Sequence, residues 1–295
     1  MIDITYGAKP EKKTAVALGY FDGLHLGHVY VINKTLSQKG LMPAVFTFNC
    51  DTTLPKFTKQ EDIISFENKR EMLEKMGVEY LYAPDYADVS ELSYERFVSE
   101  VLVKKLNVGF ACCGESFRFG KGGEGTPKRL SEMAEKYGFS AYIAEDICLD
   151  GEPVSSTRIR EFIREGKIEE ANRLLGYELR FKLPVVYGNR IGRKLSFPTI
   201  NQIIPDTNIV PRFGAYKSFV QVDGKNLRGV TNIGIRPTVG KTSGVVMETH
   251  IINFSGDLYG REIAVSLCGF LRGEKKFADL SELKEQIAKD IKNTL

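Results

Sequence analysis

Ala15-Val16-Ala17-Leu18-Gly19-Tyr20-Phe21-Asp22-Gly23-Leu24-His25-Leu26-Gly27-His28 is the stretch that decides the fold of the first part of this chain. Its four leading apolar residues indicate a buried strand, and a helical pattern follows the stretch toward Lys39. Gly19, Gly23 and Gly27 allow the backbone between strand and helix to turn tightly and to approach a ligand closely. A strand, a glycine-rich turn and a helix in this order are typical of an α/β domain.

Two of the three histidines in the chain, His25 and His28, close this stretch. Their spacing places them on one side of a helical first turn. The free N–H groups and the dipole of a helix start favour anions, and imidazoles there could donate hydrogen bonds to phosphate oxygens as charge develops. A tight turn with two solvent-facing histidines is the simpler interpretation, but the glycines and histidines would then coincide by chance. We predict His25 and His28 as catalytic residues beside a nucleotide site that includes Gly19, Phe21, Asp22, Gly23 and Gly27.

Short apolar runs alternate with helical patterns up to about residue 180. This alternation predicts a Rossmann-like parallel sheet with helices on both faces, and we place a first domain at 1–180. Strands are expected at 15–19, 44–48, 78–83, 108–113 and 141–144, and helices near 27–39, 60–76, 91–106 and 127–137.

The pattern changes after Gly176, where runs rich in β-branched and aromatic residues are separated by Gly, Pro, Asn and Asp. Such runs predict an antiparallel β-barrel, or a sandwich, as a second domain at 181–295. Strands are expected at 182–187, 215–222, 228–233, 245–254 and 261–270, with a terminal helix over 279–293.

A second phosphate-binding segment is predicted at 155–160, where serine, threonine and arginine open a helical pattern. Hydroxyls and N–H groups at a helix start bind anions, and arginine adds charged donors in a fork. Taken alone, an ordinary helix cap with solvated arginines would be the better interpretation. The predicted nucleotide-binding residues are Ser155, Ser156, Thr157 and Arg160.

A basic, glycine-containing loop precedes a Pro-Thr-Ile-Asn segment in the second domain. Its N–H groups and charges could hold a polyphosphate, and the predicted residues are Gly188, Gly192, Arg193, Lys194 and Pro198. If the chain continues extended after Pro198, Thr199 and Asn201 project to one face and offer hard oxygen ligands for Mg²⁺. A polar strand end after a surface turn is the alternative.

Glu248 lies in Val245-Val246-Met247-Glu248-Thr249-His250-Ile251-Ile252, which otherwise reads as an apolar strand. A carboxylate in such an apolar run is costly unless it has a bonding partner or a function. Accepting a proton from a hydroxyl, as a general base, would be such a function. In an ideal strand His250 shares its face and could orient it. A structural glutamate on the exposed face of an antiparallel strand is the common alternative. We predict Glu248 as a catalytic base.

Composition narrows the class of protein. The 295 residues are enough for two domains, and a net charge of +3 from 41 basic and 38 acidic residues gives no footprint for nucleic acid or a membrane surface. The N-terminal residues do not read as a secretory signal, and no apolar run reaches membrane-spanning length. The five cysteines are odd in number and lack a C-x-x-C pair, which disfavours disulfides and zinc. We expect a cytoplasmic protein, of an oligomeric state that the sequence leaves open.

The motifs together resemble a known family. The H-x-G-H of 25–28 and the S-S-T-x-I-R of 155–160 resemble the nucleotidyltransferase superfamily. Cys113-Gly114-Glu115-Ser116-Phe117-Arg118-Phe119-Gly120 is similar to the G-x-D/N-F-x-F-G segment of the prokaryotic bifunctional riboflavin kinase/FAD synthetase. The second domain resembles the riboflavin kinase module of that family in the segments 192–201, 214–216, 229–238, 248–250 and 258–260.

This resemblance implies two ATP-dependent reactions with Mg²⁺. In the second domain, Thr199 and Asn201 would help to bind Mg·ATP while Glu248 activates the terminal hydroxyl of riboflavin for attack on the γ-phosphorus, which gives FMN. In the first domain, the FMN phosphate would attack the α-phosphorus of a second ATP, giving FAD and pyrophosphate without a covalent intermediate. The implied partners are therefore riboflavin, FMN and ATP, without nucleic acid or membrane.

The chain departs from the family pattern in four segments. The chain reads Thr47-Phe48-Asn49-Cys50-Asp51 where the family has F-x-P-H-P, and Ser116 replaces an acidic or amide residue. Ser196 replaces a glycine, and Ile200 replaces the small residue of P-T-A-N. Three alternatives stay open: a riboflavin kinase with an impaired adenylylating module, a flavin-binding protein without turnover, and an adenylyltransferase for another nucleotide.

Overall fold

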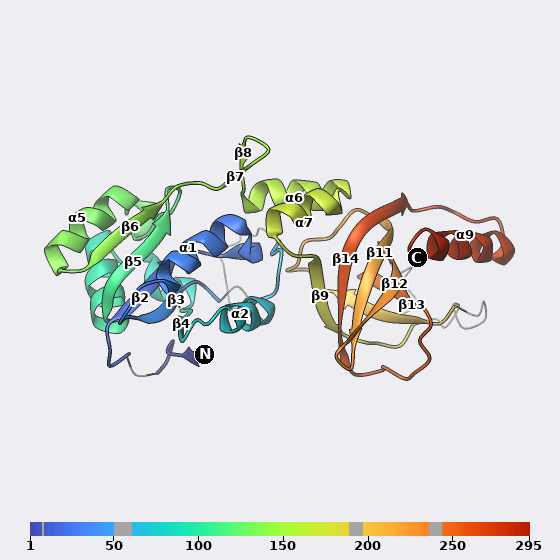
Figure 1. The fold of residues 1–295 in the computed structure, drawn as a ribbon, viewed down its shortest axis with the longest axis horizontal. Coiled ribbons are helices and arrows are strands. Elements are labelled where there is room, and N and C mark those ends of the chain that lie inside the picture. The colour runs from blue at the N-terminus through green and yellow to red at the C-terminus, as the bar shows by residue number, and fades with distance from the viewer. Residues whose placement is uncertain (8, 50–60, 189–196, 236–243) are drawn as a thin grey trace. The chain divides into compact units, whose positions relative to one another are not determined.

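The computed structural model describes residues 1–7, 9–49, 61–188, 197–235 and 244–295 (Figure 1). The chain forms two compact units, Met1–Ser155 and Ser156–Leu295. Helices α6 (Ser156–Glu165) and α7 (Ile168–Leu175) thus belong to the second unit, although they precede residue 180. Asn172 of α7 explains this, because its side chain donates to the Leu267 carbonyl at 2.9 Å and accepts the Leu179 N–H at 2.8 Å. A boundary near residue 180 between two catalytic modules stays a prediction.

The first unit is built on a parallel sheet, as predicted. Its strands run in the order β1-β4-β3-β2-β5-β6, and all five pairings are parallel. The strands are β1 (Ile2–Asp3), β2 (Thr14–Leu18), β3 (Met42–Phe46), β4 (Tyr80–Tyr82), β5 (Val108–Gly114) and β6 (Ser140–Ala144). The helices are α1 (Leu26–Leu36), α2 (Phe66–Lys75), α3 (Tyr86–Ser90), α4 (Tyr94–Arg96), a π-helical stretch (Phe97–Lys105) and α5 (Pro127–Tyr137), and a small β7–β8 hairpin (Cys148–Leu149, Glu152–Pro153) follows β6.

Local chemistry explains why these elements form where they do. All five residues of β2 are buried, as expected for a central strand covered on both faces. Thr126 caps α5 by accepting the Arg129 N–H at 3.3 Å, and Pro127 occupies the first turn. Cys112 and Cys113 are fully buried in β5, and burial raises the pKa of both thiols to about 12. They therefore pack as small apolar residues, as predicted.

The strand order places a topological switch point at β2. The strands β3 and β5 flank β2 on its two sides, so the chain direction across the sheet reverses at β2. In open α/β sheets, ligands bind outside the carboxyl ends of the strands at such a switch point. Both the histidine-containing stretch, which follows β2, and the Ser116 segment, which follows β5, start from this edge.

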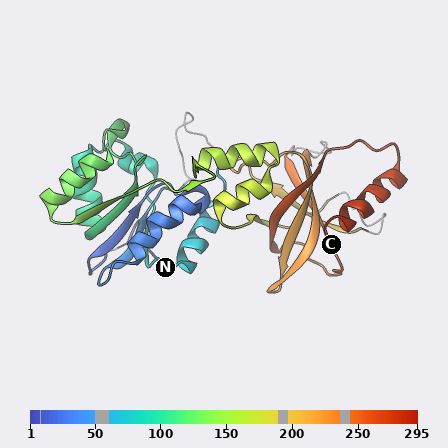
Figure 2. The ribbon, with the colours of Figure 1, turned by 45° about the horizontal axis from the view of Figure 1, so that its top comes forward.

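The second unit is a curled antiparallel sheet in the order β10-β13-β12-β11-β14-β9 (Figure 2). Its edges approach each other where the Val186 N–H donates to the Asn201 carbonyl at 2.8 Å and the Gln202 amide donates to the carbonyls of Leu183 and Ile263, each at 2.7 Å. This closure gives the barrel predicted from the sequence. The elements are β9 (Leu179–Pro184), β10 (Thr199–Ile204), β11 (Gly214–Val222), β12 (Lys225–Ile235), β13 (Val245–Ile251), β14 (Glu262–Gly273) and helix α9 (Leu280–Lys292).

Alternate residues of β13 serve different sides of this sheet. Met247, Thr249 and Ile251 are buried, whereas Glu248 is exposed and His250 is partly exposed. Thr249 joins a hydroxyl network inside the barrel, with Thr231 at 2.9 Å. The outer face, which carries Glu248, faces α9 across a cavity.

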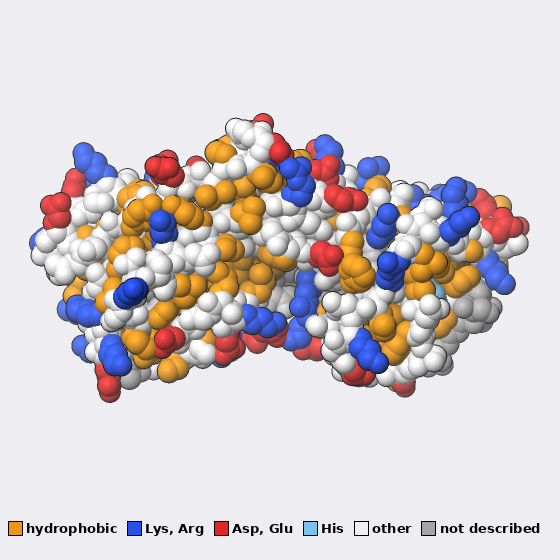
Figure 3. Space-filling model, in the orientation of Figure 1, with side chains coloured by type: hydrophobic (Ala, Val, Ile, Leu, Met, Phe, Trp, Pro, Cys, Tyr) orange, Lys and Arg blue, Asp and Glu red, His pale blue; other side chains and the backbone are white. Residues whose placement is uncertain are grey.

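The surface carries both signs of charge. On the face drawn in Figure 3, Lys and Arg side chains are scattered among Asp and Glu side chains. Within the ranges that the structure describes, no helix has the length and apolar character needed to cross a membrane.

Candidate functional sites

The turn between β2 and α1 has a strained backbone. Phe21 and Leu24 adopt positive φ angles of 53° and 38°, and Gly23 between them has φ 77°. Left-handed conformations at non-glycine residues cost about 1–3 kcal/mol each and cluster at functional sites. A Cβ on Gly27 would lie 3.2 Å from the imidazole of His25, so the missing side chain leaves room for that ring. The turn is thus shaped to place His25 and His28.

The two histidines lie face to face at the start of α1. Their ring centroids are 3.5 Å apart with planes inclined by 19°, which confirms the prediction that both lie on one side of the first turn. His25 caps the helix, because its Nδ1 accepts the His28 N–H at 3.4 Å. An Nδ1 that accepts leaves the proton of a neutral His25 on Nε2, where it can be donated to a ligand.

The environment of His28 disfavours its charged form. Burial first, and then the positive charges of His25 and Lys69, hold the pKa of His28 well below its usual value. Its Nδ1 is buried without a hydrogen-bond partner among the described atoms. A polyphosphate arriving here would bring negative charge, which raises the pKa of His28 and strengthens any hydrogen bond that it donates.

Lys69 is a charged residue of this region that the sequence analysis did not identify. Only 1% of it is exposed, and its Nζ donates to the Tyr20 carbonyl at 2.8 Å and lies 4.6 Å from the centre of the Tyr20 ring. The Tyr20 hydroxyl in turn donates to Asp62 at 2.8 Å. A signal existed in the sequence, because Lys69 lies one helical turn before the buried Leu73 and so shares its face.

The remaining predicted residues of the turn have internal contacts. Phe21 is 1% exposed and packs edge-on against His28 at 5.3 Å. Asp22, also 1% exposed, accepts the Ile63 N–H at 2.9 Å, which ties the turn to the segment before α2. Thr47, from the segment that departs from the family pattern, donates to the Tyr20 carbonyl at 2.7 Å. Cys50 and Asp51 of that segment lie outside the described residues.

The predicted phosphate-binding segment 155–160 does open a helix, since α6 begins at Ser156. Thr157 is exposed and Arg160 is 5% exposed. The division between the two compact units falls between Ser155 and Ser156. The cooperation of this helix start with His25 and His28 around one nucleotide therefore stays a prediction.

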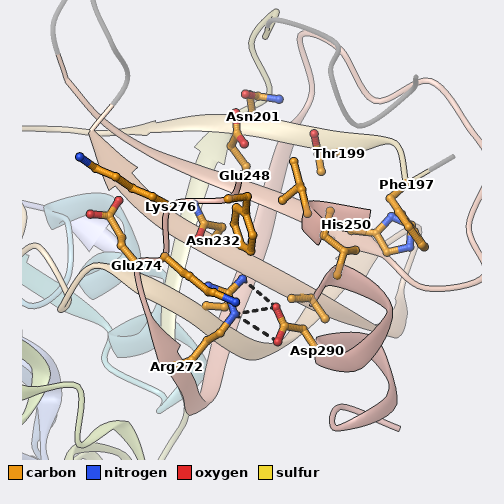
Figure 4. A pocket seen from close by; sticks show the side chains of 16 residues that line it. Phe197, Thr199, Asn201, Asn232, Glu248, His250, Arg272, Glu274, Lys276 and Asp290 are labelled. Carbon is orange, nitrogen blue, oxygen red and sulfur yellow. Dashed lines mark hydrogen bonds and ion pairs between the residues drawn. The ribbon is translucent and has the colours of Figure 1, made fainter. Parts of the chain in front are cut away.

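The second unit brings its predicted residues together on adjacent strands. In the antiparallel pairing of β10 with β13, Thr199 lies opposite His250 and Asn201 lies opposite Glu248. On the other side of β13, Asn232 of β12 also lies opposite Glu248. Opposed residues have Cβ atoms about 4.5–5.5 Å apart, so the carboxylate of Glu248 has an amide on each side. Figure 4 shows these side chains around one pocket.

The pocket is a cavity of about 610 Å³ between the outer face of the sheet and α9. A volume of this size suits a small organic ligand. One part of its wall is polar, from Thr199, Asn201 and Glu248, and the part contributed by α9 and the preceding loop includes Phe277, Leu283 and Ile287. The arrangement can therefore hold an apolar ring system while a polar chain reaches a carboxylate.

Two predicted loop residues position this site. Gly188 lies against the Asn201 side chain, since a Cβ there would be only 2.5 Å from its Oδ1. The Pro198 carbonyl accepts a hydrogen bond from Nδ1 of His250 at 2.9 Å, which anchors the start of β10. His250 thus binds the start of β10 through Nδ1, and its suggested role in orienting Glu248 stays a prediction. Gly192, Arg193 and Lys194 lie outside the described residues.

The donor set at Thr199 and Asn201 fits a divalent ion bound together with phosphates. A hydroxyl and an amide oxygen are neutral hard ligands, and the cavity beside them leaves space for further oxygens. Among the described residues, no cluster of three or more His, Cys, Asp and Glu side chains is placed to hold a metal. The negative charge that Mg²⁺ prefers would then come mainly from a nucleotide.

The cavity lining also includes polar residues that were not predicted, among them Asn232, Arg272 and Asp290. Asn232 belongs to the segment 229–238, which was noted only for its resemblance to the riboflavin kinase module. The strand register shows that it lies opposite Glu248. Arg272 and Asp290 are joined by an ion pair between a strand and a helix, at 2.8 Å. No local pattern marks either residue.

Two family models together match most of the chain. Residues 8–158 match the family model described as FAD synthetase, and residues 175–295 match the one described as riboflavin kinase. Residues 159–174, which hold most of α6 and α7, fall between the two matches.

Curated relatives match along nearly the whole chain. A bifunctional riboflavin kinase/FMN adenylyltransferase of Listeria monocytogenes is 35% identical over 95% of this chain and 90% of its own length. Proteins of that name from Bacillus subtilis and Escherichia coli are each 34% identical, over 95% of this chain and 91% of theirs. A crystal structure from Streptococcus pneumoniae, named as a macrolide-efflux protein, superposes with a TM-score of 0.87 at 27% identity, covering 99% of this chain and 98% of that one.

Proposed function

The chain belongs to the family of bifunctional riboflavin kinase/FMN adenylyltransferases, and from this membership we propose that its second unit phosphorylates riboflavin and its first unit adenylylates the FMN formed. The observation that carries the kinase half is the register that puts Asn201 and Asn232 on either side of Glu248 above one cavity. The match of both family models favours two reactions over a kinase alone.

In the kinase half, Glu248 acts as the base. Its carboxylate accepts the proton of the terminal ribityl hydroxyl as that oxygen attacks the γ-phosphorus of ATP, the bond from this phosphorus to the β–γ bridging oxygen breaks, and ADP leaves. Thr199 and Asn201 would hold Mg²⁺ together with ATP, and the ion would neutralise charge on the phosphates. The apolar side chains of Phe277, Leu283 and Ile287 face the isoalloxazine ring.

In the adenylylating half, His25 and His28 act by donating hydrogen bonds. A phosphate oxygen of FMN attacks the α-phosphorus of ATP, and the bond to the bridging oxygen of pyrophosphate breaks. Both imidazoles donate hydrogen bonds that strengthen as charge builds on the phosphate oxygens.

One incubation tests this proposal. Purified protein is mixed with riboflavin, ATP and Mg²⁺, and riboflavin, FMN and FAD are separated by chromatography over time. FMN should appear first and FAD after it, and chelation of the metal should stop both. FMN without FAD would support the impaired-adenylylation alternative, and the absence of both products would end the proposal.

Replacing Gly188 with alanine should raise the Mg²⁺ concentration needed for FMN formation or lower the rate of FMN formation. The new methyl group has to displace the Asn201 amide, and loss of support for a metal ligand lowers metal affinity or activity by about 10- to 100-fold. The measurement is the FMN rate against Mg²⁺ concentration. Gly244→Ala is the matched control, since a Cβ there meets nothing closer than 3.5 Å. An unchanged Mg²⁺ dependence in Gly188→Ala would show that Asn201 does not bind the ion.

A further inference from the structure

Helix α9 carries an unusual pattern of burial. Of all its residues, each of which the structure describes, Asp290 alone is buried, with 3% of its surface exposed. Ile287 and Leu283, one and two turns earlier on the same side, are only partly buried and line the cavity. The helix therefore meets the barrel through a carboxylate, while its apolar side chains face a space that a ligand can fill.

A two-point ion pair holds that carboxylate. The Nε and Nη2 of Arg272 lie 3.0 Å and 2.8 Å from Oδ2 of Asp290, and Nε is also 3.3 Å from Oδ1. The Gln286 amide donates to Oδ1 at 2.8 Å, and Nη1 of Arg272 donates to the Gly273 carbonyl at 3.1 Å. Fork geometry of this kind fixes both distance and angle between its partners.

The Arg272–Asp290 pair connects α9 to β14 beside the cavity. Arg272 is near the end of β14, opposite Ala215 of β11, and the chain after it runs through Phe277 into α9. Asp279 caps that helix by accepting the N–H groups of Ser281 and Glu282. The ion pair bonds the last turn of α9 to β14, and the Arg228 guanidinium of β12 donates to the Leu295 carbonyl just after the helix. The ion pair therefore helps to set the separation between α9 and the sheet. Figure 4 shows the pair beside the pocket.

We propose that Arg272 and Asp290 are positioning residues for riboflavin, which hold α9 at the separation that the flavin ring needs and thereby direct the ribityl chain toward Glu248. This role rests on the proposed kinase function of the second unit. Neither residue takes part in the proton transfer. The pair acts before chemistry, by keeping the cavity open in the absence of ligand, so that binding does not have to order the helix.

The test uses a cycle of variants in the full-length protein. Asp290→Asn keeps the shape of the side chain and removes its charge, and Arg272→Gln removes the opposing charge. Each should raise the KM for riboflavin about tenfold and leave kcat within about twofold of the parent value. The reason is that riboflavin binding must then also order α9, which costs binding free energy. The double variant should be no worse than either single one, since both remove one interaction. Riboflavin fluorescence titration should show the same loss of affinity.

Two controls separate positioning from general destabilisation. Asp223→Asn breaks a surface Arg–Asp pair with Arg261 in the same unit, away from the cavity, and should leave the riboflavin KM unchanged. Adenylylation of added FMN measures the activity proposed for the first unit, and its rate should equal that of the parent protein. A merely structural role would lower the active fraction, and so kcat, without raising KM. If Asp290→Asn fails to fold, Arg272→Lys decides, since it keeps the charge and loses the fork.

The outcomes are distinct. A riboflavin KM within twofold of the parent in both single variants, a fall in kcat alone, or single effects that multiply in the double variant would each overturn the positioning role. A parent protein that forms no FMN would overturn the proposed kinase function instead.

Discussion

Replacing Glu248 with glutamine should lower the rate of FMN formation from riboflavin by about 10²- to 10⁴-fold, the scale of general-base catalysis. Glutamine fills the same space opposite Asn201 and Asn232, so the strand register should persist while the proton acceptor is lost. Because the carboxylate acts in the transition state, kcat should fall with little change in the riboflavin KM. Steady-state rates with radiolabelled ATP give the measurement.

The first unit provides the control for Glu248→Gln. Conversion of added FMN to FAD should keep its parent rate, since the residues proposed for that reaction lie outside the barrel. Glu248→Asp is a second comparison, because it keeps a carboxylate one methylene further away and should retain part of the activity. FMN production near the parent rate in Glu248→Gln would show that another group accepts the proton.

Replacing His28 with alanine should have the opposite effect. FAD formation from added FMN should fall by about 10²- to 10³-fold, as for the loss of one donor to developing charge. Phosphorylation of riboflavin should continue, so that FMN accumulates. His28 also packs on His25 and Phe21, and His28→Asn is therefore included as a smaller change that keeps an N–H donor. Chromatographic product ratios report both activities from one sample.

The result for His28→Ala that contradicts our proposal is an equal loss of both activities. Such a loss would mean that the two reactions share a site or that the whole chain has unfolded. Thermal unfolding followed by circular dichroism separates these cases. Retention of full FAD formation would instead assign the phosphate contacts to other groups of the turn.

Much of the fold follows from patterns of sequence. The helix predicted at 127–137 matches α5, whose Thr126 and Pro127 mark the start by known capping chemistry. The terminal helix predicted over 279–293 agrees with α9 and its two caps. The helix expected at 91–106 was less accurate, since the structure has the short α4 continued by a π-helical stretch. Periodicity detects apolar faces, but it does not separate helix types that share such a face.

The sites were only partly predictable. Thr199, Asn201 and Glu248 carry chemical types that stand out in their segments, and one strand pairing brings them together. Lys69 and the Arg272–Asp290 pair depend on contacts between distant segments, such as the 2.8 Å bond from Lys69 to the Tyr20 carbonyl, which no local spacing encodes. Their functional residue types are common on surfaces, so only burial distinguishes them.

The alternation along β13 has a consequence for how this barrel can change over evolutionary time. Odd-numbered Met247, Thr249 and Ile251 are buried inside the barrel, whereas even-numbered Glu248 and His250 line the cavity. Substitutions in either set can accumulate without disturbing the other, so stability and turnover are free to drift separately. A single residue inserted ahead of Val245 would have a larger effect, because it would exchange the two sets of side chains between the faces of the strand. The carboxylate of Glu248 would then be buried among apolar side chains and would no longer line the cavity.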